Sequence, residues 1–308
     1  MKYSHAAPRA ARDGPIKPVP PKRLAGRPLY ATVGPVPAYK NRPAMAGDTP
    51  VWRYLTLSAV IATIKTRHLR LTRVDGFQDP FEGSVPKKQI EDQNTLLIGA
   101  ASRRTMMNSV AAHYPGMARL MPPDEDPWSR ITRLRRARTR SAHASCWSAC
   151  DESEALWRLY CADDGCRGVG VALRTTLARL DASVAAHDFY VSPIRYLKYH
   201  EAPAFTDEMD SLLHKRHGFA AEHELRLLKF DEAHFSALVP KDASVSELSE
   251  HIYVDWVLSD VIDEIIISPY AEVNYEDLVR DAINAKDPNL ADRVVLSVLH
   301  ERQYPPCF

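Results

Sequence analysis

The sequence predicts an α+β domain with a mostly antiparallel core, built as one or two sheets, with a helical insertion and flanking helices. The apolar fraction of 45% is ample for a core, and the charged fraction of 26% is ordinary for a soluble chain. Strand-like and helix-like segments are mixed without strict βαβ alternation, which favours an α+β fold over a parallel one. No apolar run approaches the length that spans a bilayer, so we expect no membrane partner.

A break in composition divides the 308 residues into two parts. Residues 1–48 are rich in Pro, Ala, Lys and Arg and lack a periodic apolar pattern. Such a segment buries too little surface to fold alone, so we expect a disordered or draped tail. Residues 49–308 are expected to form a single domain that contains a helical block at residues 88–140.

The first elements follow from the spacing of apolar residues. Val51–Leu55 alternates as a strand does, and Ser58 is a plausible cap for a helix over residues 58–65. A second strand is expected at His68–Thr72, followed by a loop at residues 76–83 that Gly and Pro punctuate.

The later elements are read in the same way. Strands are expected at residues 143–148, 168–173, 194–199, 222–230, 264–268 and 293–299, and helices at 154–161, 206–221 and 275–285. The run of arginines between Arg130 and Arg140 is either a phosphate-contacting helix or a solvated helix face. We favour the solvated face because no aromatic residues interleave the arginines.

Charge and cysteine content limit the class of protein. The net charge of +1 gives no global field toward nucleic acid or anionic membrane. The five cysteines are an odd number, and with no export signal we expect reduced thiols in a cytoplasmic protein. Cys146 and Cys150 are four residues apart and Cys161 and Cys166 are five apart, which is too wide for zinc knuckles, so no metal site is predicted.

The segment Glu222–Arg226 is the most informative one. In a strand, alternate side chains share a face, so Glu222, Glu224 and Arg226 would line up and continue into an apolar stripe. Buried charges are costly unless they are paired, so this row needs either mutual pairing or a ligand. A structural ion pair at a strand end and a catalytic carboxylate site both fit this pattern.

Several motifs in chain order resemble a widespread bacterial family of unknown function. They are Trp52-Arg53-Tyr54, Asp79-Pro80-Phe81-Glu82, Cys146-Trp147-Ser148, Leu156-Trp157-Arg158-Leu159-Tyr160, Glu222-His223-Glu224-Leu225-Arg226 and Ile265-Ile266-Ile267-Ser268-Pro269. Here Gln78 replaces the usual Asn, Trp147 the Phe and Leu156 the Met. The resemblance covers about Val51 to Leu299 and does not itself name a reaction.

A weaker resemblance is to the ADP-ribosyltransferase superfamily, which uses a first-strand Arg or His, a second-strand Ser or Thr and a later Glu-x-Glu strand. Arg53, Thr72 and the pair Glu222/Glu224 occur in that order, although Thr72 lies in Leu-Thr-Arg rather than Ser-Thr-Ser. The resemblance implies an enzyme that cleaves NAD and transfers ADP-ribose to a protein or nucleic-acid acceptor. By analogy alone, it suggests a toxin or phage-defence effector.

The resemblance also assigns roles to residues. Glu224 would hold the ribose and stabilise its positive charge, and Glu222 would orient or deprotonate the acceptor. Arg53 would bind the phosphates of the cofactor, and Thr72 would also contact the cofactor. One ring among Tyr54, Trp147 and Trp157 would stack on nicotinamide. Arg226 would contact the cofactor as well, unless it only neutralises a carboxylate.

Two other classes of function stay open. In a metal-dependent nuclease or phosphodiesterase, Asp79, Glu82, Glu222 and Glu224 would converge on Mg²⁺. In a non-catalytic binding or regulatory module, the aromatic residues would line a pocket, although large aromatics at such spacing are more often core.

Overall fold

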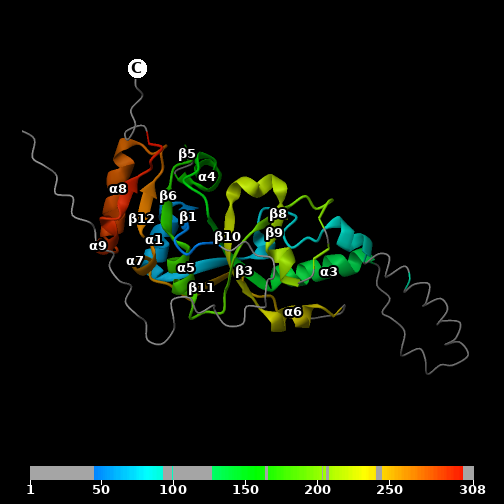
Figure 1. Ribbon diagram of the computed structural model, residues 1–308. Coiled ribbons are helices and arrows are strands. Elements are labelled where there is room, and N and C mark those ends of the chain that lie inside the picture. Colours follow the sequence, from blue (N-terminus) through cyan, green and yellow to red (C-terminus); the bar gives the residue numbers. More distant parts are fainter. Residues whose placement is uncertain are drawn as a thin grey trace, which may run out of the picture.

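The protein folds around one nine-stranded sheet with two small two-stranded sheets beside it (Figure 1). The computed structural model describes residues 45–92, 99, 127–163, 166–202, 204–205, 208–240 and 245–300. Most strand pairs of the large sheet are antiparallel, and the β12–β13 pair is parallel. The predicted α+β class with a mostly antiparallel core is therefore confirmed.

The strands of the large sheet are β1 Pro50–Leu55, β2 His68–Arg73, β3 Ala142–Ser148, β6 Val171–Thr176, β7 Tyr190–Pro193, β10 Glu224–Phe230, β11 His251–Asp255, β12 Glu264–Ile267 and β13 Val294–Leu296. The small sheets pair β4 Ala162–Asp163 with β5 Cys166–Arg167, and β8 Arg195–Leu197 with β9 His214–Arg216.

The described helices are α1 Leu57–Thr66, α3 Pro127–Arg140, α4 Glu154–Tyr160, α5 Leu177–Val184, α6 Glu232–Leu238, α7 Leu258–Val261, α8 Val273–Asn284 and α9 Pro288–Ala291. Short 3₁₀ turns are η1 Val74–Gly76, η3 Glu208–Leu212 and η4 His217–Glu222.

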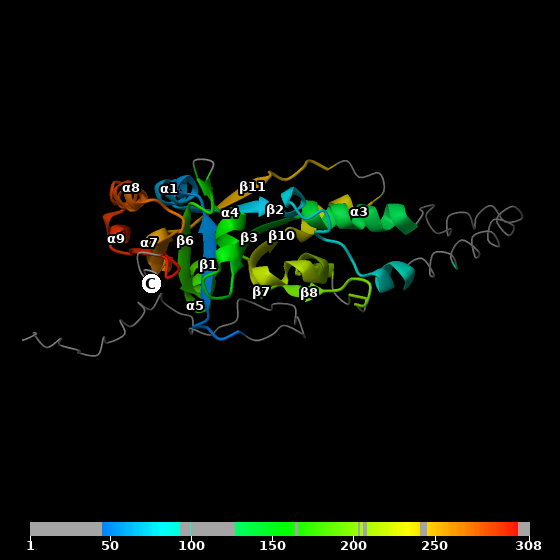
Figure 2. The same ribbon diagram turned by 90° about the horizontal axis from the view of Figure 1, so that it is seen from above.

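The large sheet forks at β3. One edge of β3 pairs with all seven residues of β10, whereas its other edge pairs with β2 near its start and with β1 at its end. In Figure 2, β1 and β6 lie toward one side of the fold, and β2, β3, β10 and β11 lie toward the other. Strand β3 thus joins the two halves of the molecule.

Register assigns side chains to the two faces of the sheet, because residues directly opposite in a ladder share a face. Trp52 lies opposite Ser148, which lies opposite Glu224, so these three side chains share one face. Their neighbours Arg53, Trp147 and Leu225 belong to the other face.

Each face has its own apolar cluster. The larger cluster packs helices α1, α5, α7 and α8 against the face that carries Leu173, Leu225 and Leu227. On the opposite face, α4 covers the β1 branch through Leu156 and Trp157. The η3 turn covers the β10 branch of that face. Burial of these side chains supplies the main favourable free energy of folding.

The first helix shows how local chemistry sets its bounds. The side chain of Thr56 accepts a hydrogen bond from the backbone N–H of Ala59, so Thr56 is the N-cap rather than the predicted Ser58. At the other end, Arg67 adopts a left-handed conformation with φ 56° and closes the helix.

The segment before β10 differs from its prediction. A helix over residues 206–221 is wrong, because β9 and the turns η3 and η4 occupy the described part of this region. The predicted strand over residues 222–230 begins two residues late, because His223 takes the left-handed conformation at φ 43°. Glu222 therefore ends a turn, while Glu224 opens the strand.

Two predicted segments fall wholly or partly outside the described residues. Residues 1–44 of the predicted tail lie outside them, and so does most of residues 93–126 in the predicted helical block. In the described part of that block, residues 87–92 and helix α3 are helical. No helix among the described residues is long and apolar enough to cross a membrane.

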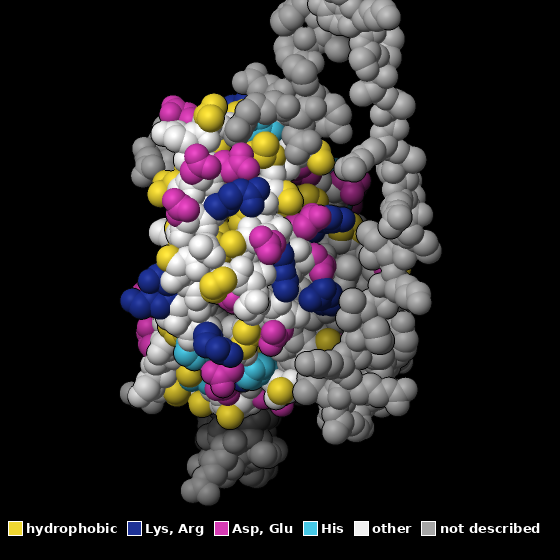
Figure 3. Space-filling view, turned by 90° about the vertical axis from the view of Figure 1, so that its left-hand side faces the viewer, with side chains coloured by type: hydrophobic (Ala, Val, Ile, Leu, Met, Phe, Trp, Pro, Cys, Tyr) yellow, Lys and Arg dark blue, Asp and Glu magenta, His cyan; other side chains and the backbone are white. Residues whose placement is uncertain are grey.

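The outer surface over α8 and α9 is mixed in charge. Basic and acidic side chains alternate there with single apolar ones (Figure 3). Such a surface produces no strong field of one sign, which agrees with the net charge of +1.

Gly170 provides a test of how closely β1 and α4 approach the start of β6. A Cβ at Gly170 would lie 2.6 Å from the carbonyl oxygen of Leu55 and 2.9 Å from Cβ of Cys161. We expect Gly170→Ala to lower the free energy of unfolding by about 1–3 kcal/mol, as overpacked sites do. Urea denaturation followed by circular dichroism measures this change.

Gly218→Ala is the matched control, because nothing lies within 4 Å of a Cβ at that position. The control should change the free energy of unfolding by less than about 0.5 kcal/mol. Equal stability of the two variants would contradict the close approach at Gly170.

Candidate functional site

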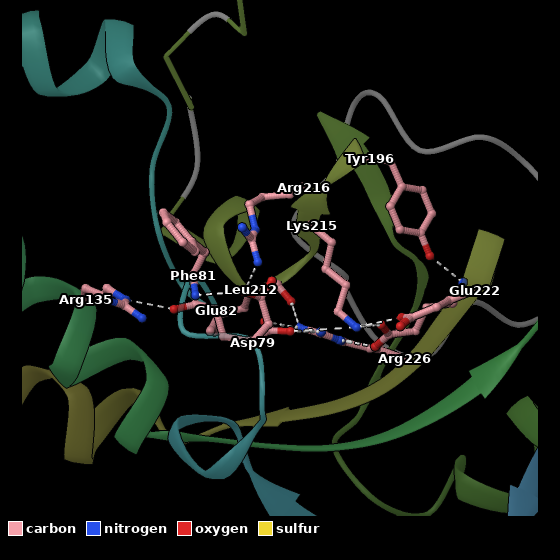
Figure 4. A network of polar contacts seen from close by, with 11 residues as sticks. Asp79, Phe81, Glu82, Arg135, Tyr196, Leu212, Lys215, Arg216, Glu222 and Arg226 are labelled. Carbon is pink, nitrogen blue, oxygen red and sulfur yellow. Dashed lines mark hydrogen bonds and ion pairs between the residues drawn. The ribbon is translucent and has the colours of Figure 1, made fainter. Parts of the chain in front are cut away.

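A cluster of charged side chains lies over the end of β10 and combines residues from distant parts of the chain (Figure 4). Arg226 and Glu224 come from β10, Glu222 from η4 and Lys215 from β9. Glu82 comes from the loop after η1. The exposed fractions of these five side chains are 0% to 11%, so water screens the charges poorly.

Arg226 is the centre of this charge cluster. Its Nη2 and Nη1 donate to the two carboxylate oxygens of Glu82 at 2.7 and 3.1 Å. Its Nε donates to Oε1 of Glu224 at 2.5 Å, and Nη1 also reaches the carbonyl oxygen of Leu212 at 2.6 Å. A bidentate carboxylate pair and a carbonyl contact are what a fully desolvated guanidinium requires.

Lys215 joins the two carboxylates that the sequence analysis singled out. Its Nζ lies 2.8 Å from Oε2 of Glu222 and 2.6 Å from Oε2 of Glu224. The first contact is a hydrogen bond, whereas Oε2 of Glu224 is buried and accepts no hydrogen bond of acceptable direction. The Lys215–Glu224 contact is therefore electrostatic, and one lone pair of Glu224 stays unsatisfied.

These contacts fix the protonation of the buried groups. Burial alone would raise the pKa of Glu224, but the nearby charges of Arg226 and Lys215 outweigh it and lower that pKa to about 2. Burial would lower the pKa of Lys215, but Glu224 and Glu222 raise it above its usual value. Both side chains are therefore ionised at neutral pH.

Cys146 lies beside the buried carboxylate. Burial and then the negative charge of Glu224 raise the pKa of its thiol well above the ordinary value, so the thiol keeps its proton. The interaction with this thiol helps in turn to lower the pKa of Glu224, which keeps that carboxylate ionised. Cys146 thus acts as a neutral group in the charge cluster, with no sign of an activated nucleophile.

Glu222 is the most exposed of the three carboxylates in the charge cluster. Its side chain is 11% exposed, and the neighbouring Tyr160 is 48% exposed. Burial and the charge of the nearby Glu222 raise the pKa of the Tyr160 hydroxyl. Ser148 donates to the backbone carbonyl of Glu222 at 2.7 Å and holds the end of η4 on β3.

The loop Asp79–Glu82 is held by three arginines. Asp79 accepts from Arg216 at 2.8 Å, while Arg135 of α3 donates to the carbonyl oxygens of Glu82 and Pro80. The guanidinium of Arg216 also lies 4.2 Å from the ring centre of Phe81. This loop therefore presents Glu82 to Arg226 in a fixed position.

The nuclease hypothesis required Asp79, Glu82, Glu222 and Glu224 to converge on a metal ion. Each of these carboxylates instead contacts an arginine or lysine of the same chain. Among the described residues, no group of three or more His, Cys, Asp or Glu side chains is placed to hold a metal ion.

The arginines of α3 also have partners within the chain. Arg140 pairs with Glu247 at 2.9 Å, and Arg138 is buried. Arg130 and Arg136 are the exposed arginines of this helix. The run therefore divides between internal contacts and a solvated face.

Of the predicted site residues, Glu222, Glu224 and Arg226 come together, but Arg53 does not join them. Arg53 lies on the opposite face of the sheet, with its guanidinium 5.7 Å from the ring centre of Trp147. Burial lowers the pKa of Arg53 to about 10, and no carboxylate pairs with it among the described residues. Arg53 and Trp147 are thus separated by the sheet from Glu224.

The remaining predicted cofactor contacts serve other roles. Tyr54 and Trp157 pack edge to face at 4.9 Å within the apolar cluster under α4. Their polar atoms bond to the backbone N–H of Ser153 and to Glu152. Thr72 pairs with Ala144, four residues before the position on β3 that pairs with Glu224. None of the three contributes a wall beside Glu222.

Lys215, Tyr160 and Tyr196 belong to the site but were not among the predicted site residues. The hydroxyl of Tyr196 accepts a hydrogen bond from the backbone N–H of Glu224 at 2.7 Å. The sequence did not identify Lys215 as a site residue, because its segment was predicted to be helical. The sequence did contain one signal for Lys215: the basic pair Lys215-Arg216 comes shortly before the Glu-x-Glu motif, and opposite charges so placed can form ion pairs.

Comparison of the chain with protein-family models, curated proteins and solved structures gave no match. The two family resemblances described above therefore stay predictions that rest on the motif residues themselves.

Removal of Arg226 tests the central pairing. Arg226→Met would leave Glu82 and Glu224 buried without their main partner, so we expect a loss of about 3–5 kcal/mol in the free energy of unfolding. Arg280→Met is the control, because Arg280 pairs with Glu276 on the surface with its side chain 40% exposed. The control should cost less than about 1 kcal/mol.

Both variants can be measured by urea denaturation at neutral pH. Equal losses in the two variants would contradict a network whose strength comes from burial.

The depressed pKa of Glu224 predicts a dependence of stability on pH. A carboxyl whose pKa is about 2 when folded and 4.5 when unfolded stabilises the fold above pH 4.5, and this contribution is lost as the pH falls toward 2. The contribution amounts to about 3 kcal/mol for such a shift. The stability difference between the wild type and Glu224→Gln should therefore shrink over this pH window.

Urea denaturation of both proteins at a series of pH values measures this difference. Circular dichroism at neutral pH would first establish that Glu224→Gln is folded. A difference that is constant between pH 5 and 2 would disprove the assigned pairing of Glu224.

Proposed function

We propose that the chain is an ADP-ribosyltransferase-like enzyme that cleaves the bond between nicotinamide and ribose in NAD at Glu222 and Glu224. The ADP-ribose would pass to a macromolecular acceptor. One observation carries this proposal: a buried charge cluster with an excess of one negative charge, whose least buried carboxylate is Glu222.

The charge count is simple. Glu82, Glu222 and Glu224 contribute three negative charges, while Lys215 and Arg226 contribute two positive charges, so the sum over these five side chains is −1. Arg135 bonds to the backbone carbonyls of the loop rather than to these carboxylates, so it is not counted. Asp79 and Arg216 cancel each other. An uncompensated charge in a poorly screened site attracts a cation more strongly than the same charge in water.

This electrostatic arrangement suits the chemistry of NAD cleavage. Positive charge builds on the ribose as the bond to nicotinamide breaks, and a fixed carboxylate stabilises that transition state. Arg226 and Lys215 hold Glu224 in place. Lys215 orients Glu222 through a hydrogen bond. Because these partners are already arranged, little reorganisation is needed when charge develops.

The proposal assigns phosphate binding to a different residue from the one that the sequence indicated. Arg53 lies across the sheet from Glu224 and takes no part. Of the three cations that pair with these carboxylates, Arg216 is the most exposed, at 39%, compared with 10% for Lys215 and 0% for Arg226. We therefore place the phosphates of the cofactor at Arg216, beside the exposed ring of Phe81.

The acceptor and the setting follow from the chemistry alone. NAD is a cytoplasmic metabolite, so a NAD-consuming enzyme of this kind would act in the cytoplasm on a protein or nucleic acid. A toxin or phage-defence effector is one role in which such consumption is useful.

Glu222→Gln tests the proposed function, since it removes the uncompensated charge with little change in shape. We expect nicotinamide release from NAD to fall by about 100-fold or more, as when a transition-state contact is lost. The melting temperature should change little, because the Lys215 contact can be kept by the amide oxygen. Chromatographic assay of free nicotinamide, with cell lysate as a source of acceptor, measures the rate.

Glu264→Gln is the matched control, since Glu264 is a partly exposed carboxylate paired with Arg174 on the other branch of the sheet. It should retain full turnover. Absence of turnover in the wild type, or full turnover in Glu222→Gln, would exclude the proposed function and leave the charge cluster as a structural ion-pair network.

A further inference from the structure

Strand β11, His251–Asp255, forms one edge of the large sheet. It pairs with β2 on one side and has no strand on its other side among the described residues. In Figure 2 it lies at the outer border of the sheet, away from β10. A free strand edge offers a row of unpaired backbone groups to another chain.

The backbone hydrogen bonds between β11 and β2 show which residues of β11 direct their backbone N–H and C=O groups toward the free edge. The backbone N–H of Trp256 donates to Arg67 at 2.8 Å, and the carbonyl of Glu250 accepts from Arg73 at 2.7 Å. Both contacts point toward β2. Since the direction alternates along a strand, the backbone groups of His251, Tyr253 and Asp255 point to the free edge.

The side chains of β11 are complementary to those of a second copy of the same strand that runs antiparallel to it. An antiparallel copy centred on Tyr253 would place His251 opposite Asp255 and Ile252 opposite Val254, with Tyr253 opposite itself. The three polar residues share one face of the strand, and Ile252 and Val254 share the face that packs on the larger apolar cluster. The match therefore holds on both faces of the sheet.

We propose that β11 pairs with β11 of a second copy of this chain, about a twofold axis at Tyr253. Each Tyr253 would exchange two backbone hydrogen bonds with the partner's Tyr253. His251 and Asp255 would do the same with the partner subunit's Asp255 and His251. The two large sheets would become one continuous sheet, with an isologous interface.

Several features of the edge support a second copy as its occupant. Tyr253 is 59% exposed and the side chain of Asp255 is 93% exposed, so a second copy can reach both. Asp255 also lies 3.2 Å from Nε2 of His68 in the same chain. The Nδ1 atom of His251 is buried without a hydrogen-bond partner. Proline and lysine, which commonly protect sheet edges from pairing, are absent from the five residues of β11.

Charge reversal tests the register. Sedimentation velocity of the full chain should show a concentration-dependent dimer. Asp255→Lys places a lysine opposite the partner's His251 at two symmetric positions, so we expect its dimer dissociation constant to rise about tenfold or more. The double variant His251→Glu/Asp255→Lys restores opposite charges across the interface and should recover most of the affinity.

A cysteine at the twofold axis gives a second, geometric test. Opposed Tyr253 residues would have Cα atoms about 5.5 Å apart, which lies within the range of disulfides. Tyr253→Cys should therefore form a covalent dimer on mild oxidation, with the crosslink mapped by mass spectrometry. Asp255→Cys should not, because those Cα atoms would lie more than about 12 Å apart.

The two tests decide the proposal without reference to enzymatic activity. A wild type that is monomeric at all accessible concentrations would overturn it. A dimer that is insensitive to Asp255→Lys, or that crosslinks equally at both cysteine positions, would place the interface elsewhere and would also overturn it.

Discussion

The pairing of Arg226 with Glu82 and Glu224 is the constraint on which the rest of the site depends. A guanidinium that is 0% exposed is tolerated only when its donors are used, and here the partners come from three segments. The same pairs hold the Asp79–Glu82 loop and the carbonyl of Leu212 against β10. One desolvated charge thus fixes the relative position of segments that are up to 144 residues apart.

Such a network is a poor way to gain stability but a good way to define a site. Replacement of buried ion pairs by apolar groups is often neutral or stabilising, so stability alone does not account for five charged side chains buried in one place. The network has one carboxylate in excess, and this leaves a negative charge at Glu222.

The sequence predicted the class of fold and most of the strands because alternation and short apolar runs reflect burial directly. It also predicted that Glu222, Glu224 and Arg226 belong together. It failed at Lys215, because helical spacing within residues 206–221 concealed β9 and two short turns, and tertiary contacts overrode that local pattern. It failed also at His223, whose left-handed conformation has no signal in the neighbouring residues.

The separation of Arg53 from Glu224 shows what motif order cannot supply. The order of motifs along the chain shows that two strands carry an arginine and a glutamate of the expected types. The register between the strands decides which face of the sheet each side chain occupies. Because Trp52, Ser148 and Glu224 are aligned across β1, β3 and β10, the side chain of β1 that lies level with Glu224 on its face is Trp52, and Tyr54 follows on the same face. The buried indole Nε1 of Trp52 has no hydrogen-bond partner among the described residues. If β1 contributes to the site at Glu224, the register requires that it do so from the face that carries this indole and not through the adjacent arginine.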